Sequence, residues 1–157
     1  MKSISFTGHR KLSEDRTLLS QRLYHRLEQE IQNGATVFHA GGAVGFDCLS
    51  AAVVLNLREV YPHIKLHLVL PCSNEEQTAK WSADEKSEFD RILNLADSVE
   101  YTSEYYDNGC MKKRNARLME LADCCICYWD GRQRSGTGQT VRMARRKKIR
   151  IVNLFDE

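Results

Sequence analysis

Short apolar runs alternate with longer amphipathic segments along the whole chain, and this alternation most constrains the fold. Runs rich in Val, Ile and Phe indicate strands, whereas apolar residues that recur every three or four positions indicate helices. Such an alternation predicts right-handed βαβ units and a mainly parallel sheet. The expected strands are residues 3–6, 36–39, 64–70, 98–101, 124–129 and 149–154, and the expected helices are 14–33, about 45–59, 85–97, 111–122 and 138–147.

The chain length suits one folding unit of this kind. Its 157 residues fit a single domain and contain no internal repeat, low-complexity tract or linker. We therefore predict an α/β fold in which residues 1–157 form a single Rossmann-like, doubly wound domain. The expected sheet has six strands and helices on both faces. Residues 72–84 are expected to form a polar loop or a short helical excursion.

Composition excludes several classes of protein. The chain is 42% hydrophobic and has two prolines, which argues against a disordered protein. It lacks an apolar run of about 20 residues, the length that spans a bilayer, and its N-terminus does not resemble a signal peptide. We therefore expect a cytoplasmic protein without a membrane partner.

Six cysteines raise the question of a metal site. Cys124 and Cys127 form a C-x-x-C, but no second pair of cysteines or histidines follows. On a strand, residues three apart also point to opposite faces of the sheet. We expect buried, reduced thiols and no metal.

Charge does not by itself indicate a nucleic-acid partner. The formal net charge is +2, although acidic residues gather in 75–90 and basic residues in 142–150. A basic helix near the C-terminus is usually a solvated helix face. We therefore do not expect a nucleic-acid partner, although single-stranded nucleic-acid binding through residues 142–150 stays an open alternative.

Three loops that follow expected strands carry residues suited to binding an anion. Glycine allows a close approach of the backbone, and the N–H groups at the start of a helix attract phosphate. We expect the second and third loops to lie at neighbouring strand ends and to share one anionic pocket. The candidate residues are Thr7, Gly8 and Arg10 in the first loop, Gly41, Gly42, Gly45 and Asp47 in the second, and Ser135, Gly136, Thr137, Gly138 and Thr140 in the third.

These loops differ from the standard nucleotide-binding motifs. The second loop is not a G-x-G-x-x-G, and the strand before it ends in His39 instead of an acidic residue. The chain also has no G-x-x-x-x-G-K-[ST] motif, which excludes a P-loop NTPase. Asp47 is expected to hold a ribose hydroxyl of the ligand, and a simple helix cap is the structural alternative for it.

Residues outside these loops extend the candidate site. Arg114 and Asn115 open the expected helix 111–122 and can add polar groups above the same crevice. Trp129 could stack on a base or belong to the core, and Trp81 could act as a lid or pin its loop to the body of the protein. Asp47, Asp130 and Arg114 are the catalytic candidates, but no catalytic set is defined.

The ordered set of motifs resembles one protein family. Thr7-Gly8-His9-Arg10, the loop Gly41-Gly42-x-x-Gly45-x-Asp47, Pro71 with Gln77 and Trp81, Gly109-Cys110, Arg114-Asn115, Asp130-Gly131, and Ser135-Gly136-Thr137 with Thr140 are similar to the YpsA-like branch of the SLOG superfamily. The similarity covers nearly the whole chain. It implies a Rossmann-like fold that binds a nucleotide or a nucleotide-derived ligand through its glycine loops.

The same resemblance implies two alternatives to simple binding or sensing. The superfamily includes LOG-type phosphoribohydrolases, which release the base from a nucleoside monophosphate, and DNA-processing protein A, which handles single-stranded DNA. LOG-type enzymes use a glutamate in P-G-G-x-G-T-x-x-E, whereas the comparable stretch here ends in Arg142. Because N-glycosidic cleavage needs a carboxylate near the sugar, this difference weighs against a hydrolase.

We therefore expect binding or sensing of a nucleotide-derived ligand at the strand C-termini. ADP-ribose, an NAD-like molecule or a nucleoside monophosphate would fit, no other cofactor is implied, and a homodimer is possible.

Overall fold

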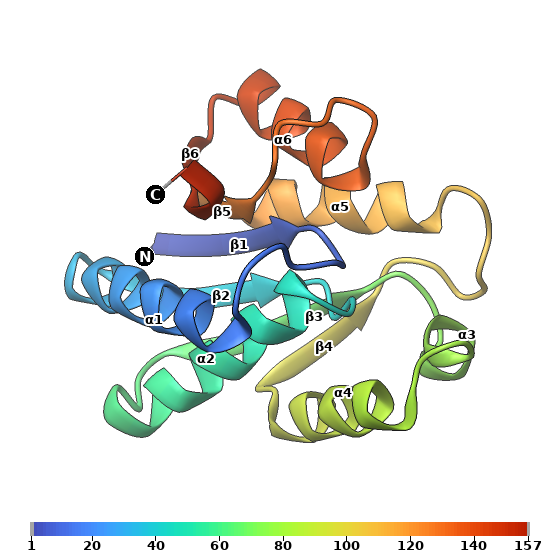
Figure 1. Cartoon of the computed structure of the whole chain (residues 1–157), viewed down its shortest axis with the longest axis horizontal. Helices are drawn as coiled ribbons and strands as arrows, with labels where there is room; N and C mark the ends of the chain where they lie inside the picture. Colours follow the sequence, from blue (N-terminus) through green and yellow to red (C-terminus); the bar gives the residue numbers. More distant parts are fainter. Residues whose placement is uncertain (1, 157) are drawn as a thin grey trace.

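The computed structural model describes residues 2–156, and these form one sheet with helices packed against it (Figure 1). The strands are β1 (Lys2–Gly8), β2 (Ala35–Ala40), β3 (Lys65–Leu70), β4 (Ser98–Tyr101), β5 (Cys124–Tyr128) and β6 (Arg150–Asn153). The helices are α1 (Arg16–Gln32), α2 (Phe46–Val60), α3 (Asn74–Thr78), α4 (Ala83–Leu95), α5 (Cys110–Leu121) and α6 (Gly136–Arg146), and a 3₁₀ turn, η1 (Leu154–Asp156), follows β6.

The sheet has the strand order β4-β3-β2-β1-β5-β6, and its neighbouring strands are all parallel. The chain runs outward from β1 to β4 and then crosses back to β5 and β6 on the other side of β1. The order therefore reverses between β1 and β5, where Gly8 is paired with Tyr128. The predicted six-stranded α/β fold is confirmed, and the sheet is wholly parallel among the described residues.

Helices cover both faces of the sheet, as predicted (Figure 1). α1, α2 and α4 lie on one face, and α5 and α6 lie on the other. Since the crossovers between parallel strands are right-handed, a helix changes face when the direction of strand addition reverses. The return from β4 to β5 therefore brings α5 across the face opposite α2.

The core follows the apolar spacing of the sequence. Leu19, Leu23 and Leu27 recur every fourth residue along α1 and are fully buried. On the sheet, the rings of Phe6 and Phe38 stack with their centroids 6.2 Å apart. Leu18, which the apolar spacing also includes, is 58% exposed, so periodicity predicts the buried side of α1 but not every residue on it.

Helix caps set boundaries that periodicity missed. α4 begins at Ala83, two residues before the expected start, because Ser82 and Glu85 form a capping box. α6 begins at Gly136, also two residues early, because Ser135 Oγ accepts the Gly138 N–H at 2.9 Å. α3 is the short helical excursion expected within residues 72–84.

All six cysteines are free and buried. Cys124 packs in the cluster under α1 and α2, whereas Cys127 packs in the cluster under α5 and α6, so the C-x-x-C spans both faces of the sheet. Within residues 2–156, no group of three or more His, Cys, Asp or Glu side chains is placed to hold a metal ion. None of the helices in this range is long and apolar enough to cross a membrane.

Candidate functional site

A pocket of about 270 Å³ opens at the C-terminal ends of the strands, beside the point where strand order reverses. Ligands of open parallel sheets bind at this position. The loops after β1, β2 and β5 and the first turns of α5 all contribute to it. The lining residues are Thr7, Gly8, His9, Arg10, Ala43, Asp47, Met111, Arg114, Asn115, Gly136 and Thr137.

The loop after β1 lines the pocket and is held by hydrogen bonds from both sides. His9 N–H donates to the Tyr128 carbonyl at 3.3 Å, and Phe46 N–H donates to the His9 carbonyl at 3.2 Å. Gly45 has φ +84°, and a Cβ at this position would lie 2.2 Å from the Arg10 carbonyl oxygen. Glycine is therefore required where the start of α2 crosses the first loop.

Asp47, in the first turn of α2, is buried and 5% exposed. Burial raises the pKa of its carboxyl group, although the positive charges of Arg114 and Arg10 and the N–H of Ala43 act in the opposite direction. The Ala43 N–H donates to Asp47 Oδ2 over 3.4 Å, which is a weak contact. Asp47 is therefore a pocket-lining carboxyl group and not simply a helix cap.

Arg114, from α5, meets the β2–α2 loop from the opposite face of the sheet. Its guanidinium donates to the Gly41 carbonyl and, at 2.8 Å, to Asn115 Oδ1. Burial lowers the pKa of Arg114, and the nearby Asp47 partly offsets this effect. A Cβ at position 41 would lie 2.6 Å from Arg114 Nη1 and 2.8 Å from Asp47 Oδ2, so Gly41 leaves space for both charged groups.

The N-terminus of α6 closes another side of the pocket. Gly136 and Thr137 line it, and their N–H groups belong to the first turn, where no acceptor exists within the helix. Thr140 Oγ1 donates to the Gly136 carbonyl at 2.9 Å. This helix therefore presents partial positive charge and backbone donors to the cavity.

The structure brings most of the predicted site residues together in this pocket. Those that line it are Thr7, Gly8, Arg10, Asp47, Arg114, Asn115, Gly136 and Thr137. The other predicted residues shape the loops around it: Gly41, Gly42, Gly45, Ser135, Gly138 and Thr140.

The two glycine loops do not lie at neighbouring strand ends, contrary to expectation. They follow β2 and β5, and β1 lies between these strands. They still reach one pocket, because Ala43 from the first and Gly136 from the second line the same cavity.

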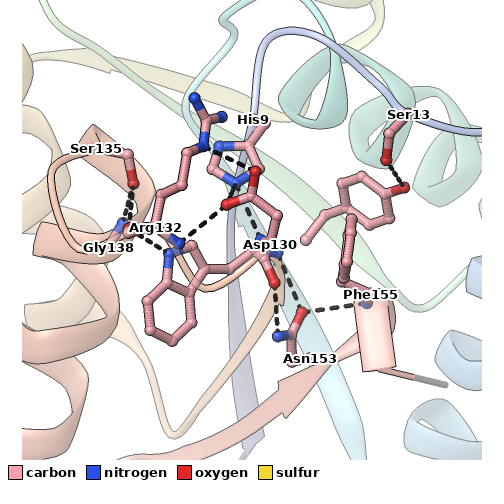
Figure 2. Close-up of polar contacts among 10 residues, drawn as sticks. His9, Ser13, Asp130, Arg132, Ser135, Gly138, Asn153 and Phe155 are labelled. Atoms are coloured by element: carbon pink, nitrogen blue, oxygen red, sulfur yellow. Dashed lines mark hydrogen bonds and ion pairs between the residues drawn. The ribbon is translucent and has the colours of Figure 1, made fainter.

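Asp130, a catalytic candidate, lies beside His9 and Arg132 and is bound to these two residues (Figure 2). Its Oδ2 accepts from Arg132 Nε at 2.8 Å, its Oδ1 lies 3.0 Å from His9 Nε2, and its own N–H donates to that nitrogen at 3.1 Å. The Arg132 N–H, helped by the charges of His9 and Arg132, lowers the pKa of Asp130. Asp130 is not among the residues that line the pocket, and it contacts the pocket through the side chain of His9.

Sequence analysis did not single out His9, Ala43 or Met111, which also line the pocket. His9 lies within the Thr7–Arg10 motif and is 8% exposed, so its place in the motif was the available signal. Trp129 belongs to the core: it is 8% exposed, its Nε1 donates to the Arg132 carbonyl at 2.8 Å, and Arg145 lies 5.5 Å from its ring centroid.

Comparison with known proteins identifies similar sequences. The family model for YpsA, described as the YspA SLOG family, matches residues 3–153. The SPbeta prophage-derived protein YoqJ of Bacillus subtilis is 32% identical over 121 residues, which cover 69% of this chain and 69% of that protein. A UPF0398 protein of Bacillus pumilus is 28% identical over 140 residues, covering 83% of this chain and 74% of the relative.

A solved structure has a similar fold. DNA-processing protein A from Helicobacter pylori, a protein studied for its single-stranded DNA binding mode, aligns with a TM-score of 0.69 at 19% identity. The alignment covers 96% of this chain and 63% of that one, so the present chain spans less than two thirds of its structural relative. At this identity the likeness concerns the fold.

Proposed function

The chain belongs to the YpsA family of SLOG proteins, and we propose that its pocket binds a nucleotide or nucleotide-derived ligand through the phosphate and the ribose. SLOG domains bind ligands of this class. The proposal rests mainly on one observation, namely that Arg10, Arg114 and the N-terminus of α6 converge on the same cavity.

The chemistry of these groups matches a phosphate. A guanidinium offers a planar set of donors for phosphate oxygens, and the first N–H groups of a helix favour an anion. Arg114 is 5% exposed and, within residues 2–156, has no carboxylate within ion-pair distance. Asp47 offsets only part of the cost of burying this cation, and a bound anion would supply the direct ion pair that Asp47 does not form.

Asp47 suits the ribose. An ionised carboxylate accepts hydrogen bonds and repels phosphate, so a sugar hydroxyl is its natural partner in an anion site. Its oxygen has only the long contact with Ala43 N–H among the bonds of the described residues, which leaves lone pairs for a diol. The sugar would therefore sit against α2, and the phosphate against Arg114 and α6.

Calorimetry with ribose 5-phosphate, AMP, ADP-ribose and NAD tests the proposal. We expect at least one of them to bind, and to stabilise the fold by about 2.7 kcal/mol when present at one hundred times its dissociation constant. Arg10→Gln and Arg114→Gln should each weaken binding about tenfold or more, as expected for the loss of a charged hydrogen-bond partner. Arg91→Gln removes the same charge from an exposed position on α4 and should not change the affinity.

Two outcomes would contradict the proposal. In the first, no phosphate-bearing compound in this series binds at millimolar concentration. In the second, Arg10→Gln binds its ligand as tightly as the unmodified protein does. Arg10 is exposed, so its replacement tests the site even if Arg114→Gln does not fold.

Hydrolysis of a nucleoside monophosphate is the second candidate, and the position of Asp47 favours it. Asp47 brings a carboxyl group with a raised pKa into the pocket, as N-glycosidic cleavage would need. Chromatography of AMP incubated with the protein measures base release. Release that disappears in Asp47→Asn would establish the hydrolase, whereas AMP that binds and stays intact would exclude it for this substrate.

A further inference from the structure

A second hollow, of about 670 Å³, adjoins the pocket. Arg10 and Met111 line both cavities and so form the boundary between them. The hollow extends toward α3 and the start of α4, and its other lining residues include Val44, Gln77, Trp81 and Tyr106. It therefore adjoins the proposed ligand site but is lined by different residues.

Gln77 presents an unused hydrogen-bond acceptor. The side chain is 7% exposed, and its Nε2 donates to the Gly42 carbonyl at 3.4 Å. Because a carbonyl oxygen cannot bond to the amide oxygen, this contact sets the orientation of the amide. Gln77 Oε1 is buried and has no hydrogen-bond partner within the described residues. Buried polar atoms normally have partners, so this one points to a missing donor.

Trp81 supplies a fixed aromatic surface on the same hollow. Its ring meets Phe89 edge to face, with centroids 5.4 Å apart, and Phe89 is fully buried in the core. The backbone N–H of Trp81 donates to the Thr78 carbonyl at 3.0 Å. Trp81 is thus anchored to the body of the protein, as one of the two sequence-based interpretations held, while it still lines the hollow.

The sizes of the two cavities argue that they act together. Small-molecule sites usually measure roughly 300–1,000 Å³. The pocket, at about 270 Å³, falls just below this range and suits a sugar phosphate, whereas the hollow at about 670 Å³ leaves room for a ring system. A ligand with both parts would occupy both cavities.

We propose that this hollow is a nucleobase subsite, in which an amino-bearing base stacks on Trp81 and donates an N–H to Gln77 Oε1. The proposal rests on the proposed function, because the base must be attached to a ribose phosphate held in the pocket. Aromatic side chains stack on any base, so Trp81 provides affinity and Gln77 provides selection. The ligand class is therefore a nucleotide whose base carries an N–H donor, such as the amino group of adenine, guanine or cytosine, or a larger molecule that contains one.

Calorimetry on the full chain with a stepwise series of ligands tests the subsite. Ribose 5-phosphate probes the pocket alone, purine riboside 5′-monophosphate adds a ring without an amino group, and AMP, GMP and CMP add the amino group. We expect an increase in affinity at each step for at least one of the three nucleotides. Trp81→Leu should reduce its affinity about tenfold or more, and Gln77→Met about three- to tenfold.

Matched variants separate the subsite from general damage. Tyr105→Leu removes an aromatic ring that is 67% exposed, and Gln29→Met replaces an exposed glutamine on α1, so both should bind every ligand normally. Trp81→Leu and Gln77→Met should bind ribose 5-phosphate as the unmodified protein does. Circular dichroism shows whether each variant is folded. If Trp81→Leu does not fold, Gln77→Met alone tests the subsite.

The two proposals fail in different ways. If ribose 5-phosphate binds but no base increases its affinity, or if the increase survives in Gln77→Met and Trp81→Leu, the base subsite is wrong and the pocket proposal stands. If neither the sugar phosphate nor any nucleotide binds, the proposed function is wrong and the subsite falls with it.

Discussion

Asp47 and Arg114 are charged side chains that the fold buries with few direct partners. Their carboxyl and guanidinium groups both adjoin Gly41, yet they do not form an ion pair within 4 Å among the described residues. Burial opposes the charged form of each, raising the pKa of Asp47 and lowering that of Arg114. A protein retains such groups at a site that needs them for binding or chemistry.

Replacing Asp47 with asparagine should stabilise the free protein at neutral pH. Because the pKa of Asp47 is raised in the folded state, the carboxyl group ionises more readily in the unfolded state, and stability falls as the pH rises above its ordinary value of 3.8. Asp47→Asn should therefore be more stable than the unmodified protein at pH 7, and the difference should shrink as the pH falls toward 4. Urea unfolding at several pH values measures this.

Asp47→Asn should also bind the nucleotide ligand less tightly. The carboxyl group that lowers the stability of the free protein at pH 7 would then be the group that binds the ligand. A variant that is less stable at pH 7, with no change on acidification, would show that Asp47 is held by favourable contacts and is not a strained binding group.

Among the elements, α4 illustrates how a local signal positions a distant group. Ser82 Oγ accepts the Glu85 N–H at 3.2 Å, and Glu85 Oε1 accepts the Ser82 N–H at 2.9 Å. This capping box fixes the first turn of α4 directly after Trp81, and the helix then carries Phe89 against the Trp81 ring. The start of α4 thus sets the wall of the second hollow.

Ser82→Ala should lower the free energy of unfolding by about 0.5–2 kcal/mol, because it removes the N-cap acceptor. Ser87→Ala, an exposed position inside the same helix, should leave stability unchanged or raise it slightly because alanine has the higher helix propensity. Chemical denaturation compares the two. Equal effects for both variants would mean that the capping box does not stabilise α4.

Across the whole molecule, Glu30 joins three elements far from the pocket. It lies at the C-terminal end of α1, where its Oε2 accepts from Lys2 Nζ of β1 at 3.0 Å and from Arg150 Nη2 of β6 at 2.9 Å. Burial alone would raise the pKa of Glu30, but the hydrogen bonds from Arg150 and Lys2 outweigh it and lower the pKa. The Glu30 carboxylate of α1 thus links Lys2 of β1 to Arg150 of β6.

Glu30→Gln should destabilise the fold by about 1–3 kcal/mol at pH 7, as expected for the loss of charged hydrogen bonds. Since the folded-state pKa of Glu30 is depressed, Glu30 stabilises the fold above its ordinary pKa of 4.5, and this stabilisation disappears as the pH falls through the lower pKa of the folded state. The difference in the free energy of unfolding between Glu30→Gln and the unmodified protein should therefore vanish in acid. Glu59→Gln, at an exposed position on α2, should show neither effect in the same urea titrations.

Local signals in the sequence were sufficient to determine the order and type of the main elements and to point to the candidate loops, but not every helix boundary. The leucines of α1 and the glycines after β2 act within a few residues, so their patterns can be read without knowing the rest of the fold, whereas the Ser82 and Ser135 caps that begin α4 and α6 were missed. The Rossmann-like class follows from their alternation.

Only the tertiary structure decided which of these residues meet. The reversal of strand order places β5 beside β1, and it carries α5 across the sheet so that Arg114 reaches Gly41, a residue 73 positions away. The pairing of β3 with β2 brings Gln77 to Gly42, and Gln77 Oε1 has no partner among the described residues, a feature for which no sequence pattern exists. The physical reason is that strand pairing and helix packing bury surfaces distant in sequence, and their energies depend on the whole arrangement and not on neighbouring residues.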